Sequence, residues 1–354
     1  MNKKIIITPV AEKKENPNNA GSKAREDLEK ILICYGFQLK EIPLYRYQEM
    51  KHCRWKFVYK KIRAFVEFWR FFVTLKKDSV LFFHWPLGNI KNYSSMTFLL
   101  KKYKKLRTIC AVHDLNTLRF QGDFSDKEAD QLKKFDVLIV HNEKMKALCL
   151  ERGICEKQMY VLGVFDYCLE QQNIPVHMFS KEIAVAGNLA GDKAGYVNDL
   201  PEGSLVYHLY GKGYTGKETE HVQYHGIFLP DALADKMEGS FGLVWDGNDI
   251  DDCTGLGRYL RYNNPHKISL YLAAGLPVII WKEAALAEWI SNRKLGIAVE
   301  RLDQIEELLD MMRQEEYEEM AENARREGRK LRQGKYFRQV MDTIEEEEDI
   351  NGLS

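Results

Sequence analysis

The segment NNPHKISLYLAAGLPVIIW, from Asn263 to Trp281, predicts a helix followed by a buried strand. Residues 265–274 have an apolar helical pattern, and Gly275 and Pro277 end the helix and start the strand. Lys267 stands at the helix start, where backbone N–H groups and the helix dipole favour a diphosphate. The candidate nucleotide-binding residues here are Asn264, His266 and Lys267. A helix–turn–strand that binds no ligand remains the alternative.

Short apolar runs alternate with longer helical patterns over the whole chain, which is typical of parallel βα units. The predicted strands of the first half are Lys4–Val10, Gln38–Leu44, Ser79–Pro86, Thr108–His113, Val137–His141 and Tyr160–Val164. Those of the second half are Glu182–Gly187, Ser204–Tyr210, Val222–His225, Phe241–Trp245, Pro277–Trp281 and Gly296–Glu300. Helical patterns lie near residues 22–35, 55–75, 93–105, 125–134, 143–152, 231–238, 265–274, 284–291, 302–332 and 336–347.

A chain of 354 residues suits two domains rather than one core. We predict an α/β fold of two facing doubly wound, Rossmann-like domains, with a ligand cleft where the carboxyl ends of both sheets meet. The first domain covers residues 1–165, a linker covers 166–180, and the second domain covers 181–332. Residues 333–354 form a C-terminal helix.

The cysteines and the N-terminus favour a cytoplasmic protein. The seven cysteines are odd in number and have no CxxC or Cys/His ligand spacing, so neither a disulfide framework nor a zinc site is expected. The apolar run near the N-terminus is too short for a signal peptide or a membrane span.

The formal net charge of zero conceals a strong asymmetry. Residues 1–165 hold 32 Lys and Arg against 18 Asp and Glu, whereas the remainder holds 20 against 34. A basic half indicates an anionic partner such as a membrane surface, a lipid phosphate or nucleic acid. The basic half has no aromatic–basic motif of an RNA- or DNA-binding fold, so we do not expect nucleic acid.

Three further loops of the second domain fit a nucleotide. Glycines let backbone N–H groups approach a phosphate, and lysines add positive charge. The candidate residues in these loops are Gly187, Asn188, Lys193, Tyr210, Gly211, Lys212 and Gly226. Their spacing matches neither a Walker nor a Rossmann fingerprint, and plain turns are the alternative.

Four motifs in order resemble one family of enzymes. They are NAGSKAREDLEKIL (19–32), VHDLNTLRF (112–120), FGLVWDG (241–247) and PHKISLYLAAG (265–275). Together they resemble the bacterial Gtf3-like glucosyltransferases and their galactofuranosyltransferase relatives, over about residues 5 to 300. The resemblance implies the glycosyltransferase architecture called GT-B. In that architecture the last helix commonly crosses back onto the first domain, and the segment around Gly226 usually contacts the base.

The resemblance implies transfer of a hexose, galactofuranose or glucose, from a UDP-sugar to a glycan or lipid-linked glycan in surface polysaccharide or glycoconjugate assembly. It implies no cofactor beyond the donor substrate, and inversion if the sugar is galactofuranose. Many GT-B enzymes have a carboxylate for the ribose three residues after the motif lysine. Leu270 occupies that position here, so the ribose contact must come from elsewhere.

The candidate catalytic residues are His113 and Asp114, which leave the carboxyl end of a predicted strand and therefore face the cleft. Either side chain can act as the base for an acceptor hydroxyl. The alternative is that both side chains cap the next helix and bond locally. Candidates for the phosphate or acceptor side are Gly21, Ser22, Lys23, His84, Trp85 and Arg119. Trp85 is expected to stack on a sugar, with a half-buried tryptophan as the alternative.

Residues 55–75 predict an aromatic, basic, amphipathic helix. Two interpretations stay open. The apolar face packs on the sheet or in a homo-oligomer interface, or the helix makes a peripheral contact with an anionic membrane.

Asp249 and Asp251 mimic a metal-binding DxD motif, but they stand in a polar loop rather than after an early strand. We interpret this loop as solvated and expect no metal. Two other functions remain open, namely a sugar-nucleotide epimerase and a non-catalytic partner subunit that kept the fold.

Overall fold

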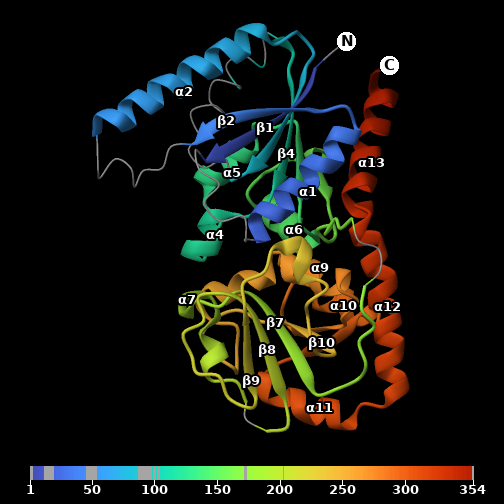
Figure 1. The fold of residues 1–354 in the computed structure, drawn as a ribbon. Coiled ribbons are helices and arrows are strands. Elements are labelled where there is room, and N and C mark those ends of the chain that lie inside the picture. The colour runs from blue at the N-terminus through green and yellow to red at the C-terminus, as the bar shows by residue number, and fades with distance from the viewer. Residues whose placement is uncertain are drawn as a thin grey trace.

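Two parallel sheets of six strands each build the molecule (Figure 1). The computed structural model describes residues 3–11, 20–44, 54–86, 98, 101, 104–170, 174–201 and 203–352. The strand order is β2-β1-β3-β4-β5-β6 in the first sheet and β12-β11-β10-β7-β8-β9 in the second. The prediction of two doubly wound α/β domains is therefore confirmed.

The first sheet contains β1 (Lys4–Ala11), β2 (Gln38–Leu44), β3 (Val80–Trp85), β4 (Arg107–Val112), β5 (Val137–Val140) and β6 (Met159–Val161). Its connecting helices are α1 (Ala20–Cys34), α2 (Arg54–Thr74), α4 (Asn116–Gln121), α5 (Asp126–Leu132) and α6 (Glu143–Glu151). The helix expected over residues 93–105 falls mostly outside the described residues. The strand order reverses between β1 and β3, which places a crevice at their carboxyl ends.

The second sheet contains β7 (Glu182–Asn188), β8 (Val206–Lys212), β9 (Val222–Gly226), β10 (Phe241–Val244), β11 (Val278–Trp281) and β12 (Gly296–Val299). Its helices are α7 (Gly191–Ala194), α8 (Pro230–Leu233), α9 (His266–Ala273), α10 (Ala287–Asn292), α11 (Ile305–Met311) and α12 (Gln314–Arg332), and a 3₁₀ helix spans Gly255–Arg261. Here the order reverses between β7 and β10. The carboxyl ends of the two sheets supply the walls of the site described below.

Every predicted strand overlaps an observed one, because short apolar runs between helices have few places other than a buried parallel sheet. Two helices were predicted wrongly. The helix expected over 231–238 is one turn, α8. The helix expected over 302–332 divides into a 3₁₀ turn, α11 and α12. The break is at Arg313, whose backbone is extended and whose N–H donates to the Glu316 carboxylate that caps α12.

The first part of the segment between the two sheets, residues 164–169, is mostly buried. Asp166 is fully buried, and its carboxylate accepts the backbone N–H groups of Tyr336 and Phe337 at 3.2 and 2.7 Å. These bonds fix the start of α13 (Lys335–Gly352). Burial raises the pKa of Asp166 to about 7, although the two N–H groups oppose the shift.

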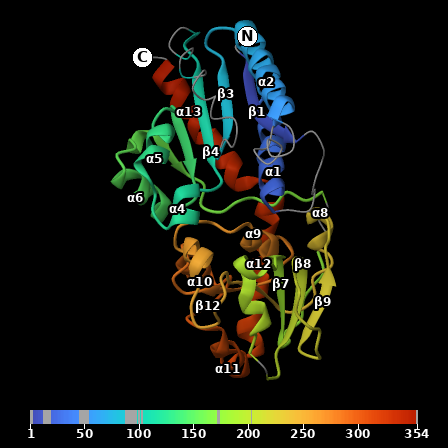
Figure 2. The ribbon, with the colours of Figure 1, turned by 90° about the vertical axis from the view of Figure 1, so that its left-hand side faces the viewer.

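Helix α13 packs on the first domain, although α12 before it belongs to the second (Figures 1 and 2). Phe337, Met341 and Ile344 lie in the same buried cluster as Phe82 of β3 and Ile109 of β4. The chain therefore crosses between the domains twice.

Helix α2 projects from the first domain (Figure 1). A row of its apolar side chains is exposed. Trp55, Tyr59, Ile62, Phe65 and Trp69 are all exposed, and Trp55 retains 84% of its accessible surface. Among the α2 side chains that the structure describes, Phe72 is buried in the core and Phe71 packs against the same cluster, both near the C-terminal end. Within the described ranges, no helix has the length and apolar character needed to cross a membrane.

Candidate active site

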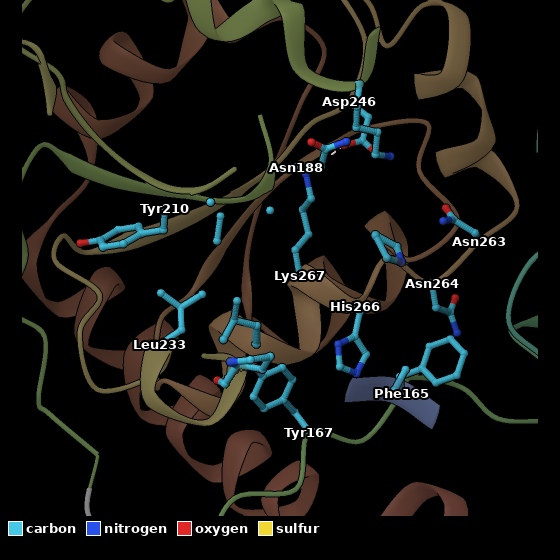
Figure 3. Close-up of a pocket in the computed structure, with 18 of the residues that line it drawn as sticks. Phe165, Tyr167, Asn188, Tyr210, Leu233, Asp246, Asn263, Asn264, His266 and Lys267 are labelled. Carbon is cyan, nitrogen blue, oxygen red and sulfur yellow. Dashed lines mark hydrogen bonds and ion pairs between the residues drawn. The ribbon is translucent and has the colours of Figure 1, made fainter. Parts of the chain in front are cut away.

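A cavity of about 460 Å³ lies between the carboxyl ends of the two sheets (Figure 3). From the first domain it is bordered by His113, Asp114 and Arg119. From the second it is bordered by Gly187, Asn188, Lys193, Tyr210, Gly211, Lys212, Asn264, His266 and Lys267. The carboxyl ends of both sheets therefore face the same space, where open α/β sheets bind ligands.

Two lysines share one buried carboxylate at the second-domain wall. Asp246, which follows β10, is 2% exposed and forms ion pairs with Lys193 and, at 2.9 Å, with Lys267. Burial disfavours the ionised carboxyl group, but the two ammonium charges outweigh it and hold the pKa of Asp246 below its ordinary value. Figure 3 shows Lys267 reaching from α9 toward Asp246. Two cations against one anion leave a net positive wall beside the start of α9.

The glycines at the ends of β7 and β8 allow these strands to approach closely beside the lysines. Gly187 and Gly211 have φ of 134° and 141°, a region that favours glycine. A Cβ on Gly211 would lie 1.7 Å from the Gly187 carbonyl oxygen. Any other residue at 211 would therefore force the two loops apart and reshape the cavity.

An aromatic and apolar wall completes the second-domain side. The Tyr210 ring stacks on His225 at 4.8 Å, and its hydroxyl accepts the Glu238 backbone N–H at 2.8 Å. Gly226 itself does not border the cavity, but the next residues, Ile227 and Phe228, do. This wall has the flat, apolar character that suits a nucleotide base.

Asn264, which was predicted to bind the nucleotide, has its side-chain amide fully engaged within the protein. Its amide donates to the carbonyls of His141 and Gly163 at 2.7 and 2.9 Å and accepts from Asn142 at 2.7 Å. Its backbone N–H donates to His141 Nδ1 at 3.0 Å. Asn264 borders the cavity, but these bonds join the two domains.

His266 has one buried ring nitrogen whose hydrogen bonding is unmet by the described residues, at the start of α9. Its Nε2 lies 3.2 Å from the Asp166 carbonyl, which can only accept, so Nε2 carries the proton. Nδ1 is then an acceptor, and it has no hydrogen-bond partner among the described residues. Burial lowers the pKa of His266 to about 4, which keeps the ring neutral.

Asp114 points into the cavity and pairs with Arg119 at 2.7 Å. Burial raises its pKa from the ordinary value, against the attraction of Arg119 and Lys193. The capping alternative for Asp114 is wrong. The first N–H groups of α4, on Asn116 and Thr117, donate to Glu128 at 3.0 and 2.8 Å, and Asp114 caps none of them. It bonds locally to Arg119 instead, and its side chain borders the cavity.

His113 is held by neighbours on its own domain. Its ring stacks on Phe165 at 5.7 Å, and its Nε2 lies 2.9 Å from Nδ1 of His84. Burial, helped by the nearby Arg25 guanidinium, holds the pKa of His113 well below its ordinary value, so the ring is neutral at pH 7.

Three predicted residues of the phosphate or acceptor side do not reach the cavity. His84 is 2% exposed and contacts His113 from behind. Trp85 is 3% exposed, lies in the core and donates its Nε1–H to Glu128 at 2.9 Å, so the expected sugar stacking is wrong. Lys23 is 3% exposed, and its ammonium is held by Asp27, the Cys168 carbonyl and Asp231. Gly21 and Ser22 lie at the start of α1, near Ala24, which borders the cavity.

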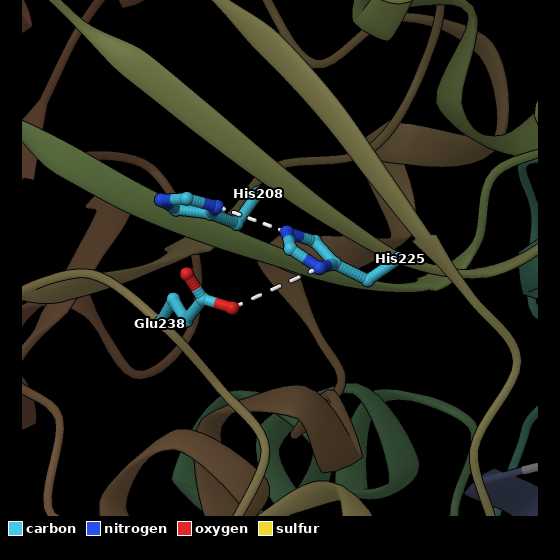
Figure 4. A group of neighbouring side chains, drawn as sticks. All are labelled: His208, His225 and Glu238. Carbon is cyan, nitrogen blue, oxygen red and sulfur yellow. Dashed lines mark hydrogen bonds and ion pairs between the residues drawn. The ribbon is translucent and has the colours of Figure 1, made fainter.

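The structure also gathers His208, His225 and Glu238, whose ligand atoms lie within 4.8 Å of one another (Figure 4). The two imidazole rings are hydrogen-bonded to each other, with Nδ1 of His208 and Nε2 of His225 3.0 Å apart. Sequence spacing gave no sign of this group, because its members come from β8, β9 and the turn before β10.

Two residues of the site were not among those predicted from the sequence, Asp246 and Glu29. Glu29 lies 3.4 Å from His84. Asp246 had a signal, since it follows the predicted strand 241–245 directly and so stands at a carboxyl edge. Glu29 had none, because a glutamate on an amphipathic helix is ordinarily solvated.

Each of the two domains that form this site matches a protein-family model. The glucosyltransferase 3-like N-terminal domain matches residues 4–164, and the glucosyltransferase 3-like C-terminal domain matches residues 183–344. The chain belongs to the glucosyltransferase 3-like family. This glycosyltransferase family was the one indicated by the four sequence motifs, so that recognition is confirmed.

Individual relatives agree with the family assignment. The glucosyltransferase 3-like chain is 31% identical to the β-1,6-galactofuranosyltransferase WbbI of Escherichia coli over 92% of its own length and 94% of that protein. It is 24% identical to glucosyltransferase 3 of Streptococcus gordonii, over 74% and 78%. Its fold resembles that of Anabaena HepE, solved with UDP-glucose, with a TM-score of 0.57, 11% identity and coverage of 97% and 99%. The GT-B architecture is thereby confirmed.

Proposed function

We propose that this glucosyltransferase 3-like protein transfers a hexose, galactofuranose or glucose, from a UDP-sugar to a glycan acceptor in surface polysaccharide or glycoconjugate assembly. The observation that carries the proposal is the cavity between the domains. One wall carries Lys193, Asp246 and Lys267, which suit a leaving diphosphate. The opposite wall carries His113 and Asp114, which suit an acceptor hydroxyl.

The diphosphate is proposed to lie against Lys193, Lys267 and the start of α9, with the base against Tyr210 and Phe228. Charge-assisted bonds and the helix dipole both favour an anion there. Nδ1 of His266 suits a donating sugar hydroxyl. The complex of HepE with UDP-glucose supports a UDP-sugar as the donor class for this fold.

Galactofuranose is the donor sugar that we place first. WbbI, named a galactofuranosyltransferase, is the relative at 31% identity over 92% of the chain, whereas the glucosyltransferase from Streptococcus gordonii is at 24% over 74%. Glucose is therefore the second candidate.

In an inverting transfer, a base removes the acceptor proton while the acceptor oxygen attacks C1 of the sugar and UDP leaves. The proposed base is His113 or Asp114, both of which border the cavity. The lysines neutralise the charge that develops on the diphosphate, so the proposal needs no metal ion.

The test is a product assay with purified protein. UDP-galactofuranose and UDP-glucose are each incubated with acceptors that end in N-acetylglucosamine or galactose, and products are identified by mass spectrometry. A hexose-extended acceptor with equimolar UDP supports the proposal. An isomerised UDP-sugar formed without acceptor would mean an epimerase, and UDP binding without any turnover would favour the non-catalytic partner.

We further propose that the protein works at the cytoplasmic face of an anionic membrane and that α2 makes the contact. The exposed apolar row of α2 is followed by exposed Arg70, Lys76 and Lys77. Apolar insertion with basic flanks is the chemistry that binds an anionic lipid surface. Such a contact would bring the cavity near a lipid-linked acceptor.

A further inference from the structure

Three side chains from three elements form a line that ends at the cavity. Glu29 of α1 lies 3.4 Å from Nε2 of His84, which is near the end of β3. This is a close charge contact that is not an aligned hydrogen bond. Nδ1 of His84 lies 2.9 Å from Nε2 of His113, which follows β4. The His84 side chain is 0% exposed, and the Glu29 side chain is 12% exposed. Water therefore has little part in deciding where the protons of this line reside.

The Glu29 carboxylate determines which ring nitrogen of His84 carries the proton. Burial disfavours the ionised form of Glu29, but contacts with His84 and Thr8 outweigh it and hold the pKa of Glu29 below its ordinary value. An ionised carboxylate only accepts hydrogen bonds, so a lone pair on Nε2 of His84 facing it would be repelled. Burial lowers the pKa of His84, so the ring carries one proton. That proton is on Nε2, and Nδ1 is an acceptor.

The unprotonated Nδ1 of His84 in turn determines which ring nitrogen of His113 carries the proton. Because Nδ1 of His84 has a lone pair, Nε2 of His113 must carry the proton and donate it. His113 is also neutral, so its Nδ1 is unprotonated. No residue of the described segments makes a hydrogen bond to this Nδ1, and His113 borders the cavity.

We propose that Glu29, acting through His84, fixes the tautomer of His113 so that an unprotonated Nδ1 faces the acceptor hydroxyl. The inference rests on the proposed transferase activity. The acceptor proton moves to Nδ1, the acceptor oxygen bonds to C1, and the bond from C1 to the diphosphate oxygen breaks with its electrons leaving on UDP. His113 then keeps Nε2–H donated to His84, whose Nε2–H faces the negative Glu29. His113 is the catalytic residue, and Glu29 and His84 are positioning residues.

The direct test needs no activity. Protein labelled with ¹⁵N-histidine gives ring nitrogen and proton shifts that distinguish the two tautomers, and His113→Ala assigns the His113 signals. We expect the Nε2–H form in the native protein. In Glu29→Gln the amide can donate as well as accept. The proton position on His84 is then no longer fixed, and His113 populates both tautomers. Glu26→Gln, an exposed glutamate on the same helix, is the matched control and leaves the signals unchanged.

A double-mutant cycle on turnover tests the catalytic consequence. Glu29→Gln should lower kcat by roughly ten- to a thousandfold, with KM for the UDP-sugar unchanged, since a misprotonated base loses part of its contribution. In the His113→Ala background the same substitution should have no further effect. Melts followed by circular dichroism show whether each variant is folded.

An Nδ1–H tautomer of His113 in the native protein would overturn the inference, whatever the activity. So would a Glu29→Gln protein whose His113 signals are native. An expected tautomer in a protein that transfers no sugar would instead refute the proposed function and leave the tautomer assignment standing.

Discussion

Asp246 sets the charge that a diphosphate meets at the second-domain wall. Removing Lys267 would leave Asp246 neutralised by Lys193 alone and would eliminate the net positive charge of the group. We expect Lys267→Ala to weaken UDP binding by about 1.5–3 kcal/mol, or roughly ten- to hundredfold, measured by calorimetry. Lys282→Ala is the control, because Lys282 forms an exposed pair with Glu300. An unchanged dissociation constant in Lys267→Ala would remove this lysine from the site.

The catalytic pair on the opposite wall should affect turnover and not nucleotide affinity. Asp114→Asn keeps shape and removes charge, whereas His113→Ala removes the ring. Loss of a general base costs about 10²–10⁴-fold in rate, so the variant that lacks the base should show a loss of that size. Both should bind UDP nearly as the native protein does, since the proposed nucleotide contacts are in the other domain. Near-native turnover in both variants would rule this pair out.

Single residues were predicted where local pattern and position in the sheet agreed. Lys193, Lys267, His113 and Asp114 all border the cavity because they follow strands or start a helix at a carboxyl edge. Trp85 follows the same rule, yet its ring is directed into the core toward Glu128. The alternation of side chains along a strand does not fix where the side chain of its last residue points. The hydrogen bond to the buried Glu128 of α5 fixes the Trp85 ring.

At the scale of elements, the joint between β5 and α9 contains a pH-sensitive contact. His141 donates from Nε2 to the Val112 carbonyl at 2.9 Å and accepts the Asn264 N–H at Nδ1, so it is held neutral. Burial lowers its pKa to about 4, from 6.5 in the unfolded chain. Between pH 6.5 and 4, His141 is therefore protonated in the unfolded state but not in the native state. The stability that His141 contributes is complete above pH 6.5 and is lost as pH falls.

We expect this loss to amount to on the order of 3 kcal/mol by pH 4. Urea unfolding of native protein and His141→Gln at pH 7.5 and at pH 5 measures it. The difference in stability between the two proteins should shrink at the lower pH. A difference that stays constant over this range would contradict the neutral, buried state of His141.

Helix α2 supports a separate prediction. Replacing Trp55 and Trp69 by serine removes two large exposed apolar groups, each worth about 1.5–3 kcal/mol when buried. Sedimentation with phosphatidylglycerol vesicles should fall by more than about tenfold, and binding to neutral phosphatidylcholine vesicles should be weak for all proteins. Met311→Ser, an exposed apolar residue on α11, is the control. Loss of an oligomer on gel filtration, with no vesicle binding by the native protein, would assign the row to a subunit interface instead.

At the scale of the whole molecule, the two-domain fold followed from the sequence because apolar runs and Gly–Pro punctuation specify parallel strands locally. The contacts that depend on the docking of the two domains did not. Asn264 was assigned to the nucleotide because its motif suggested it, but its amide bonds His141 and Gly163 across the joint. Partners 101 and 123 residues away in the chain leave no local pattern.

The proposed metal independence is also a property of the whole site. Activity should persist in EDTA, because lysines and a helix start replace the cation at the leaving group. Zinc and manganese are then added back in parallel. Complete loss in EDTA with rescue by either metal would contradict the proposal and direct attention to His208, His225 and Glu238.

The return of α13 to the first domain has a consequence during synthesis on the ribosome. Phe82 and Ile109 share their buried cluster with Phe337, Met341 and Ile344. While the ribosome is still translating the second domain, this face of the first sheet is covered by α1 but not yet by α13. The first domain, though made first, therefore becomes complete only after α13 has emerged, and the nascent chain carries an adhesive apolar surface until then.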